Sequence, residues 1–149
     1  MKKITTVLTA AFMLFAVFAF ATDKDNVTAK VKASFVKDFS AAADVSWEKS
    51  NDFYLATFTI NQLEVNAAYN EAGELVATSR SIATSQLPLS VSMAITKKYE
   101  GYTVSPKVME LNYEGVTRYY LYVENDQQVL KLKCSGSGNI EVERKTKKK

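Results

Sequence analysis

One order of elements occurs twice along this chain, and this repeat restricts the possible fold more than any other feature. Apolar residues at four-residue spacing predict an amphipathic helix in each copy. They are Val27, Val31, Phe35 and Phe39 in the first copy, and Leu87, Val91, Ile95 and Tyr99 in the second. Pro88 stands at the start of the second helix, where its missing N–H costs no hydrogen bond, and Gly101 follows its end.

Each predicted helix is followed by short segments rich in β-branched and aromatic residues, which are typical of strands. In the first copy, one strand is predicted to start at Val45, and three more are predicted over Phe53–Ile60, Leu63–Tyr69 and Glu74–Arg80. The second predicts Thr103–Tyr113, Thr117–Glu124, Gln127–Lys133 and Asn139–Val142. Turn residues separate these segments, and Gly73 and Gly138 precede matching strands of the two copies.

The repeat predicts an α+β fold, in which a helix plus three or four antiparallel strands occurs in tandem. Two such copies, over about 27–81 and 82–142, form one curved antiparallel sheet most economically if both helices lie on one face. We therefore expect a single domain over residues 22–142, which is an ordinary size for one domain.

The chain begins with the three parts of a secretory signal peptide. Lys2 and Lys3 are followed by an uncharged run from Ile4 to Phe20, and Ala19-Phe20-Ala21 supplies the small residues of a cleavage site. The run is shorter than the roughly 20 apolar residues of a membrane span. We therefore expect cleavage after Ala21, export to the periplasm or the medium, and no transmembrane segment in the mature chain.

The chain contains no histidine, and this excludes several classes of enzyme. Ser-His-Asp and Cys-His nucleophilic sites and the usual zinc ligand sets all need histidine. No Gly-rich phosphate loop occurs. Chemistry that uses only carboxylates, as in glycoside hydrolysis, stays open, but the acidic residues are scattered and no pair stands out. The sequence therefore favours a protein that is not an enzyme and that uses no cofactor and no metal.

The positive net charge of the chain comes from its two ends, above all from residues 143–149. Of 19 lysines and arginines, two lie in the predicted signal peptide and five in residues 143–149, which leaves 12 against 15 acidic residues over 22–142. Nucleic-acid binding needs a basic face on the folded domain, so we expect no nucleic-acid partner. The tail of residues 143–149 lacks apolar residues, and we predict that it is disordered.

Two single residues are interpreted as parts of the core. Cys134 is the only cysteine, so no internal disulfide is possible, and it is expected as a small apolar core residue near a strand end. Trp47 stands two positions after Val45, at the entrance to the predicted sheet, and is expected to pack inward.

Alternation along the strands predicts which side chains remain open to solvent. Over Thr117–Glu124, one side carries Tyr119, Leu121 and Val123, and the other, here called the tyrosine face, carries Arg118, Tyr120, Tyr122 and Glu124. By the same rule, Phe53, Glu110, Lys131 and Lys133 are expected on the open side, and Met109, Leu111 and Tyr113 in the core. Because Tyr and Arg are enriched in binding hot spots, the candidate binding residues are Arg118, Tyr120, Tyr122, Phe53 and Lys131. Cross-strand pairing that only stabilises the sheet is the alternative interpretation.

The spacing of core residues is similar to that of one known family. The similarity rests on these residues and motifs: Phe35 and Phe39, Val45-x-Trp47-Glu48, the strand Phe53–Phe58, Gly73-x-Leu75, Leu87-Pro88 and Tyr99-x-Gly101-Tyr102. Over most of residues 27–142 the chain resembles the PepSY-like, β-lactamase-inhibitor-like family of exported bacterial proteins of the Bacteroidetes type. The resemblance implies a tandem α+β repeat with two helices behind a curved sheet. This sequence contains no segment that matches an inhibitory loop.

Two functions follow as hypotheses from these observations. The first is an exported binding protein that contacts another cell-envelope protein through the tyrosine face, as an inhibitor or regulator of that protein. The second is a periplasmic carrier that encloses a small apolar ligand between sheet and helices.

Overall fold

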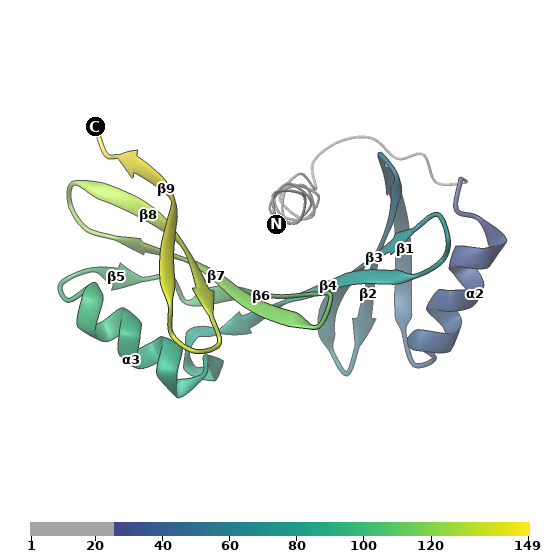
Figure 1. Cartoon of the computed structure of the whole chain (residues 1–149), viewed down its shortest axis with the longest axis horizontal. Coiled ribbons are helices and arrows are strands. Elements are labelled where there is room, and N and C mark those ends of the chain that lie inside the picture. Colours follow the sequence, from purple (N-terminus) through teal and green to yellow (C-terminus); the bar gives the residue numbers. More distant parts are fainter. Residues whose placement is uncertain (1–25) are drawn as a thin grey trace. The chain divides into compact units, whose positions relative to one another are not determined.

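The computed structural model describes residues 26–149, in two compact units that meet between Thr78 and Ser79. The predicted signal peptide, with its cleavage site, lies outside the described residues. In the first unit, a helix precedes the strands (Figure 1). Its elements are α2 (Ala29–Asp38), β1 (Ala43–Ser50), β2 (Phe53–Ile60), β3 (Leu63–Asn70) and the beginning of β4 (Leu75–Ala83).

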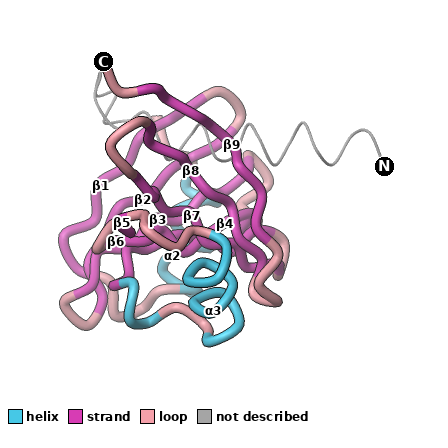
Figure 2. The backbone as a smooth tube through the Cα atoms, turned by 90° about the vertical axis from the view of Figure 1, so that its left-hand side faces the viewer, coloured by secondary structure: helices cyan, strands magenta, loops and turns pink. Residues whose placement is uncertain are grey.

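The second unit repeats this order, with a helix before its own strands. After the end of β4 come the short 3-10 helix η1 (Thr84–Gln86), α3 (Leu89–Lys98), β5 (Thr103–Val104), β6 (Lys107–Tyr113), β7 (Val116–Glu124), β8 (Gln128–Ser135) and β9 (Ile140–Lys147). Strands make up most of the described chain, as the colouring of Figure 2 shows.

The strands form one open, nine-stranded antiparallel sheet, which confirms the predicted α+β fold class. The order is β1-β2-β3-β4-β6-β7-β8-β9, and β5 pairs with β7 outside this path. Each of the two α-helices of the described residues is followed by at least four strands. No helix within residues 26–149 is both long enough and apolar enough to cross a bilayer.

The core of the first unit forms between α2 and one side of β2 and β3. Thr28 starts the helix, because its side-chain oxygen accepts a hydrogen bond from the Val31 N–H at 3.2 Å. Phe35 points from the helix into a group of aromatic rings, 5.1 Å from Trp47 and 5.0 Å from Phe58 between ring centroids. Trp47 therefore packs against the core, as the sequence predicted.

The core of the second unit joins α3 to one side of β6, β7 and β8. Tyr119, Leu121 and Val123 of β7 lie in this core, in agreement with the predicted alternation. They are joined by Val91 and Ile95 of the helix and by Val108, Leu130, Leu132 and Cys134 of the neighbouring strands. Leu130 and Leu132 alternate with Lys131 and Lys133, so the two lysines lie on the tyrosine face, as the alternation predicted.

The faces predicted for β6 are wrong. Val108 lies in the helix-side core, whereas Leu111 pairs with Arg118 and Met109 pairs with Tyr120, on the tyrosine face. Glu110 pairs with Tyr119 and so lies on the helix side. The error has a physical cause: β6 carries apolar residues on both sides, and a strand buried on both faces has no clear alternation in its sequence.

The predicted disorder of residues 143–149 is wrong as well. β9 extends to Lys147 and pairs with β8 from Cys134–Ile140 to Gln128–Lys147, with one shift of register between Leu132 and Lys131. Glu143 forms an ion pair with Lys131 at 3.2 Å, and Glu124 forms one with Lys148 at 3.1 Å. Lysines are common on edge strands, where their charge discourages pairing with another chain, so a lysine-rich end is compatible with a strand at this position.

Candidate functional site

The tyrosine face of β7 belongs to the second unit, and its tyrosines differ in exposure. Tyr122 is 50% exposed, although its neighbours Leu121 and Val123 are fully buried in the core on the other side. Tyr120 is only 4% exposed, so the expectation that it is open is corrected. It lies on the central strand between Met109 and Lys133, and the ammonium group of Lys131 lies 5.6 Å from its ring centroid.

Charged side chains surround these tyrosines on the adjoining strands. Lys131 and Lys133 of β8 lie opposite Tyr122 and Tyr120 in register. The Nζ of Lys131 is 3.2 Å from an Oε2 of Glu143, and the Nζ of Lys133 is 3.2 Å from an Oε2 of Glu141. The result is an exposed aromatic ring beside two lysine–glutamate pairs.

Arg118 lies on the same side of β7 as Tyr120 and Tyr122. Its Nη1 donates a hydrogen bond to the carbonyl of Thr117 at 3.2 Å. Burial and the carboxylate of Glu143 raise the pKa of Tyr120 to about 12, while the charge of Arg118 acts in the opposite direction. Tyr120 is therefore a neutral hydrogen-bonding group near neutral pH, and the positive charge on this part of the face belongs to Arg118 and the lysines.

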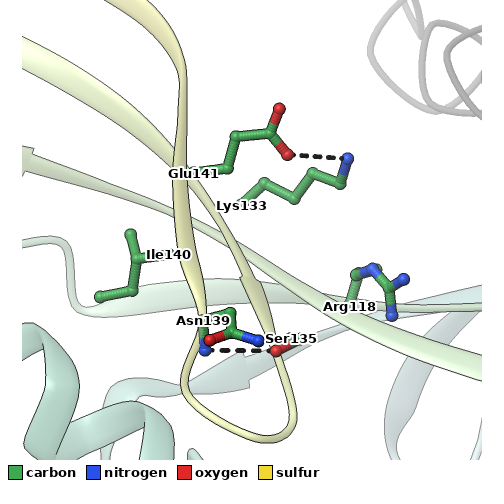
Figure 3. Close-up of a pocket in the computed structure, with 6 residues that line it drawn as sticks. All are labelled: Arg118, Lys133, Ser135, Asn139, Ile140 and Glu141. Atoms are coloured by element: carbon green, nitrogen blue, oxygen red, sulfur yellow. Dashed lines mark hydrogen bonds and ion pairs between the residues drawn. The ribbon is translucent and has the colours of Figure 1, made fainter.

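A polar pocket of about 280 Å³ opens beside Arg118 (Figure 3). The hairpin between β8 and β9 forms one end of it, where the Asn139 N–H donates to the Ser135 Oγ at 3.2 Å. The lining residues are Arg118, Lys133, Ser135, Asn139, Ile140 and Glu141. Since only one of these six is apolar, the pocket suits a polar or charged group.

The structure brings together four of the five candidate binding residues. Arg118, Tyr120, Tyr122 and Lys131 lie on β7 and β8 of the second unit. Phe53 lies in the first unit, at the start of β2, where it pairs with Ser50 and Asn70. The site described here therefore consists of residues from the second unit.

Sequence reasoning missed three contributors to this surface. Glu141 and Glu143 pair with the two lysines, and Asn139 lines the pocket. All three belong to β9 or the turn before it, and most of that strand was assigned to a disordered tail. The useful signal was the position of the segment: it follows a four-residue Ser-Gly turn directly after a strongly alternating strand, as in a hairpin.

Cys134 is a core residue and contributes nothing to this surface. Its side chain is fully buried in the second core, and burial raises the pKa of its thiol to about 11, with Lys98 opposing. A buried thiol with a raised pKa is a poor nucleophile. The groups on the tyrosine face offer charged and neutral hydrogen bonds and aromatic contact, which are suited to binding.

The fold and this surface together define a class: an exposed, aromatic and charged strand face in an α+β protein built from two helix-plus-sheet copies. Solved structures from Bacteroides species share this fold. A DUF2874 family protein from Bacteroides ovatus superposes with a TM-score of 0.69 at 20% identity, over 83% of this chain and 89% of that chain. A BLIP-like protein from Bacteroides fragilis has a TM-score of 0.68 at 18% identity, over 87% and 89%.

A third structure, from Bacteroides eggerthii, is named provisionally as a periplasmic protein. It has a TM-score of 0.66 at 19% identity and covers 87% of this chain and 90% of that one. Neither a protein-family model nor a curated protein sequence matches the chain. The resemblance inferred from the spacing of core residues is therefore confirmed at the level of the fold.

Proposed function

We propose that this chain is a non-enzymatic binding protein of the cell envelope, acting as an inhibitor or regulator of another protein that it contacts through the tyrosine face. The observation that carries the proposal is the exposure of Tyr122, which is 50% accessible on a strand whose other side is packed into a core. An exposed tyrosine ring supplies contact area at low entropic cost, together with a polar hydroxyl group.

Location in the envelope is supported by two observations. Residues 1–21 have the pattern of a signal peptide, and a solved structure with the same fold carries a periplasmic name. A protein partner is supported by the BLIP-like name of another. The apolar-ligand carrier has less support, because the pocket on the tyrosine face is lined mainly by charged and polar groups.

Site-specific photo-crosslinking tests the proposed face in cells. A photoreactive phenylalanine analogue at position 122 should capture a discrete envelope protein. The control is the same analogue at Leu89, which is 74% exposed on α3, away from the tyrosine face. Equal capture at both positions, or none at position 122, would contradict the proposal.

A pair of substitutions on β7 separates binding from stability. Tyr122→Ala should cost on the order of 2 kcal/mol of partner binding if Tyr122 is a hot spot, with a stability change within about 0.5 kcal/mol. Leu121→Ala should instead destabilise the fold by about 2–5 kcal/mol. Affinity by calorimetry and urea unfolding measure the two effects. If Tyr122→Ala unfolds as readily as Leu121→Ala, the face has been assigned incorrectly.

A further inference from the structure

The polar pocket beside Arg118 has an imbalance of charge. It contains two cationic side chains, Arg118 and Lys133, and one anionic side chain, Glu141. Glu141 already pairs with Lys133 at 3.2 Å. Among residues 26–149, no acidic side chain lies within ion-pair distance of the Arg118 guanidinium. The pocket therefore contains one positive charge that the described protein does not neutralise.

The surroundings of Arg118 strengthen its attraction for an anion. In register across the sheet it lies between Leu111, which is fully buried, and Ser135, which belongs to the pocket wall. Arg118 itself is half-buried. Since a charged hydrogen bond gains strength where water is partly excluded, a partner for this guanidinium would be bound more firmly than at an open surface.

The neutral groups of the pocket hold its shape. The Ser135 Oγ accepts from the Asn139 N–H and shares a hydrogen bond of 2.8 Å with the Ser137 Oγ. The Ser135 N–H donates to the Asn139 carbonyl at 3.0 Å. These bonds fix the end of the β8–β9 hairpin. Arg118, whose Nη1 donates to the Thr117 carbonyl, keeps further N–H donors beside the pocket (Figure 3).

We propose that this pocket binds a carboxylate group, supplied by an acidic side chain of the partner protein. A guanidinium presents two parallel N–H donors that match the two oxygens of a carboxylate. A phosphate dianion fits less well, because the Glu141 carboxylate in the pocket wall would repel a second negative charge. The source of the carboxylate rests on the proposed function: Arg118 lies on the same side of β7 as Tyr122, four residues or roughly 13 Å away.

A matched pair of small probes tests the chemistry without the partner. The probes are N-acetyl-glutamate N-methylamide, which carries one carboxylate, and N-acetyl-glutamine N-methylamide, its neutral isostere. In NMR titrations of the chain from residue 22, the glutamate probe should shift the Arg118 Nε–H and the amides of Ser135 and Asn139 saturably. The glutamine probe should bind at least about tenfold more weakly, as charge-assisted bonds are roughly twice as strong as neutral ones.

Substitutions assign the effect to Arg118. Arg118→Gln should weaken binding of the glutamate probe about tenfold or more, and Arg118→Lys, which keeps the charge but loses the fork, should give an intermediate loss. Arg144→Gln is the matched control, because it removes the same charge from β9 outside the pocket lining. Dispersed amide spectra of each variant establish that it is folded, and Lys133→Gln provides a second pocket variant.

Three results would overturn the carboxylate site: equal affinity for both probes, full affinity in Arg118→Gln, or tighter binding of inorganic phosphate than of the glutamate probe. None of them depends on the partner protein. Conversely, if the glutamate probe binds as expected but crosslinking at position 122 captures nothing, the pocket is retained as a site for a small carboxylate ligand, and the protein partner is rejected. The two proposals can thus fail separately.

Discussion

Cys134 shows how far the environment of one residue decides its chemistry. Its side chain is fully buried among the apolar residues of the second core, close to Leu132 and Tyr99. Burial raises the pKa of the thiol from 9.0 to about 11. Because only the thiolate reacts with alkylating and disulfide reagents, both access and ionisation protect this cysteine in the native protein.

We expect Cys134 to react far more slowly in the folded chain than in the unfolded one. Below pH 9, a pKa difference of two corresponds to about 100-fold less thiolate, and burial adds to this protection. Reaction with a disulfide reagent at pH 8, with and without urea, measures the ratio. The raised pKa also favours folding below pH 9, and this contribution is lost as the pH rises from about 9 to 11. A native rate within tenfold of the unfolded rate would contradict this description.

Gly138 occupies a position that only glycine suits, for two separate reasons. Its φ is +91°, in the left-handed region that side chains disfavour. A Cβ atom there would also lie 2.7 Å from the carbonyl oxygen of Ser90 on α3. Gly115 has a similar φ of +78° but no heavy atom within 4 Å of such a Cβ.

These two glycines form a matched pair for mutation. Both Gly115→Ala and Gly138→Ala should cost about 1–2 kcal/mol through backbone strain. Gly138→Ala should cost a further 1–3 kcal/mol or so, since the helix must move to relieve the contact. Urea unfolding of the two variants gives the difference directly. Equal destabilisation would show that α3 moves away at no cost.

At the scale of elements, local patterns predicted what depends on local chemistry. Four-residue spacing located both helices, and β2 has the predicted bounds because turn residues flank it on both sides. The side of β6 that faces the helix could not be predicted from local patterns. Leu111 and Val108 are both apolar, and only the pairing in the sheet decides which of them faces the helix. The site was predicted in part for the same reason. The alternation of β7 was clear, but Glu143 lay in the segment predicted to be disordered, and only the pairing of β9 with β8 brings Glu141 to Lys133.

Removing the end of β9 should destabilise the protein. Deletion of residues 143–149 eliminates the outer half of the β8–β9 pairing and the ion pairs of Lys131 with Glu143 and of Lys148 with Glu124. It would also expose part of β8 as a new edge. We expect the melting temperature to fall by several degrees, as the loss of about 1 kcal/mol does in small domains.

Deletion of Lys149 alone is the control for this truncation, because it changes the charge of the terminus and leaves every pair of β9 in place. Thermal unfolding followed by circular dichroism compares the two. An unchanged melting temperature in the longer deletion would mean that the outer half of β9 contributes nothing to the stability of the second unit.

For the whole molecule, the notable feature is that each unit has a core of its own. The core around Phe35 and Phe58 and the core around Leu121 and Leu132 share no residue. Each core also contains one natural reporter. Trp47, the only tryptophan, packs 5.1 Å from Phe35 in the first unit, and Cys134, the only cysteine, is fully buried in the second.

These reporters allow the unfolding of the two units to be followed separately. Leu132→Ala removes a fully buried side chain from the second core, at a cost of about 2–5 kcal/mol. Because Phe35 and Trp47 belong to the core of the first unit, we expect the urea midpoint for Cys134 labelling to fall while the midpoint for Trp47 fluorescence stays close to that of the wild type. Phe58→Ala should have the reverse effect. If both midpoints fall together by the same amount in either variant, the two units unfold as one cooperative structure.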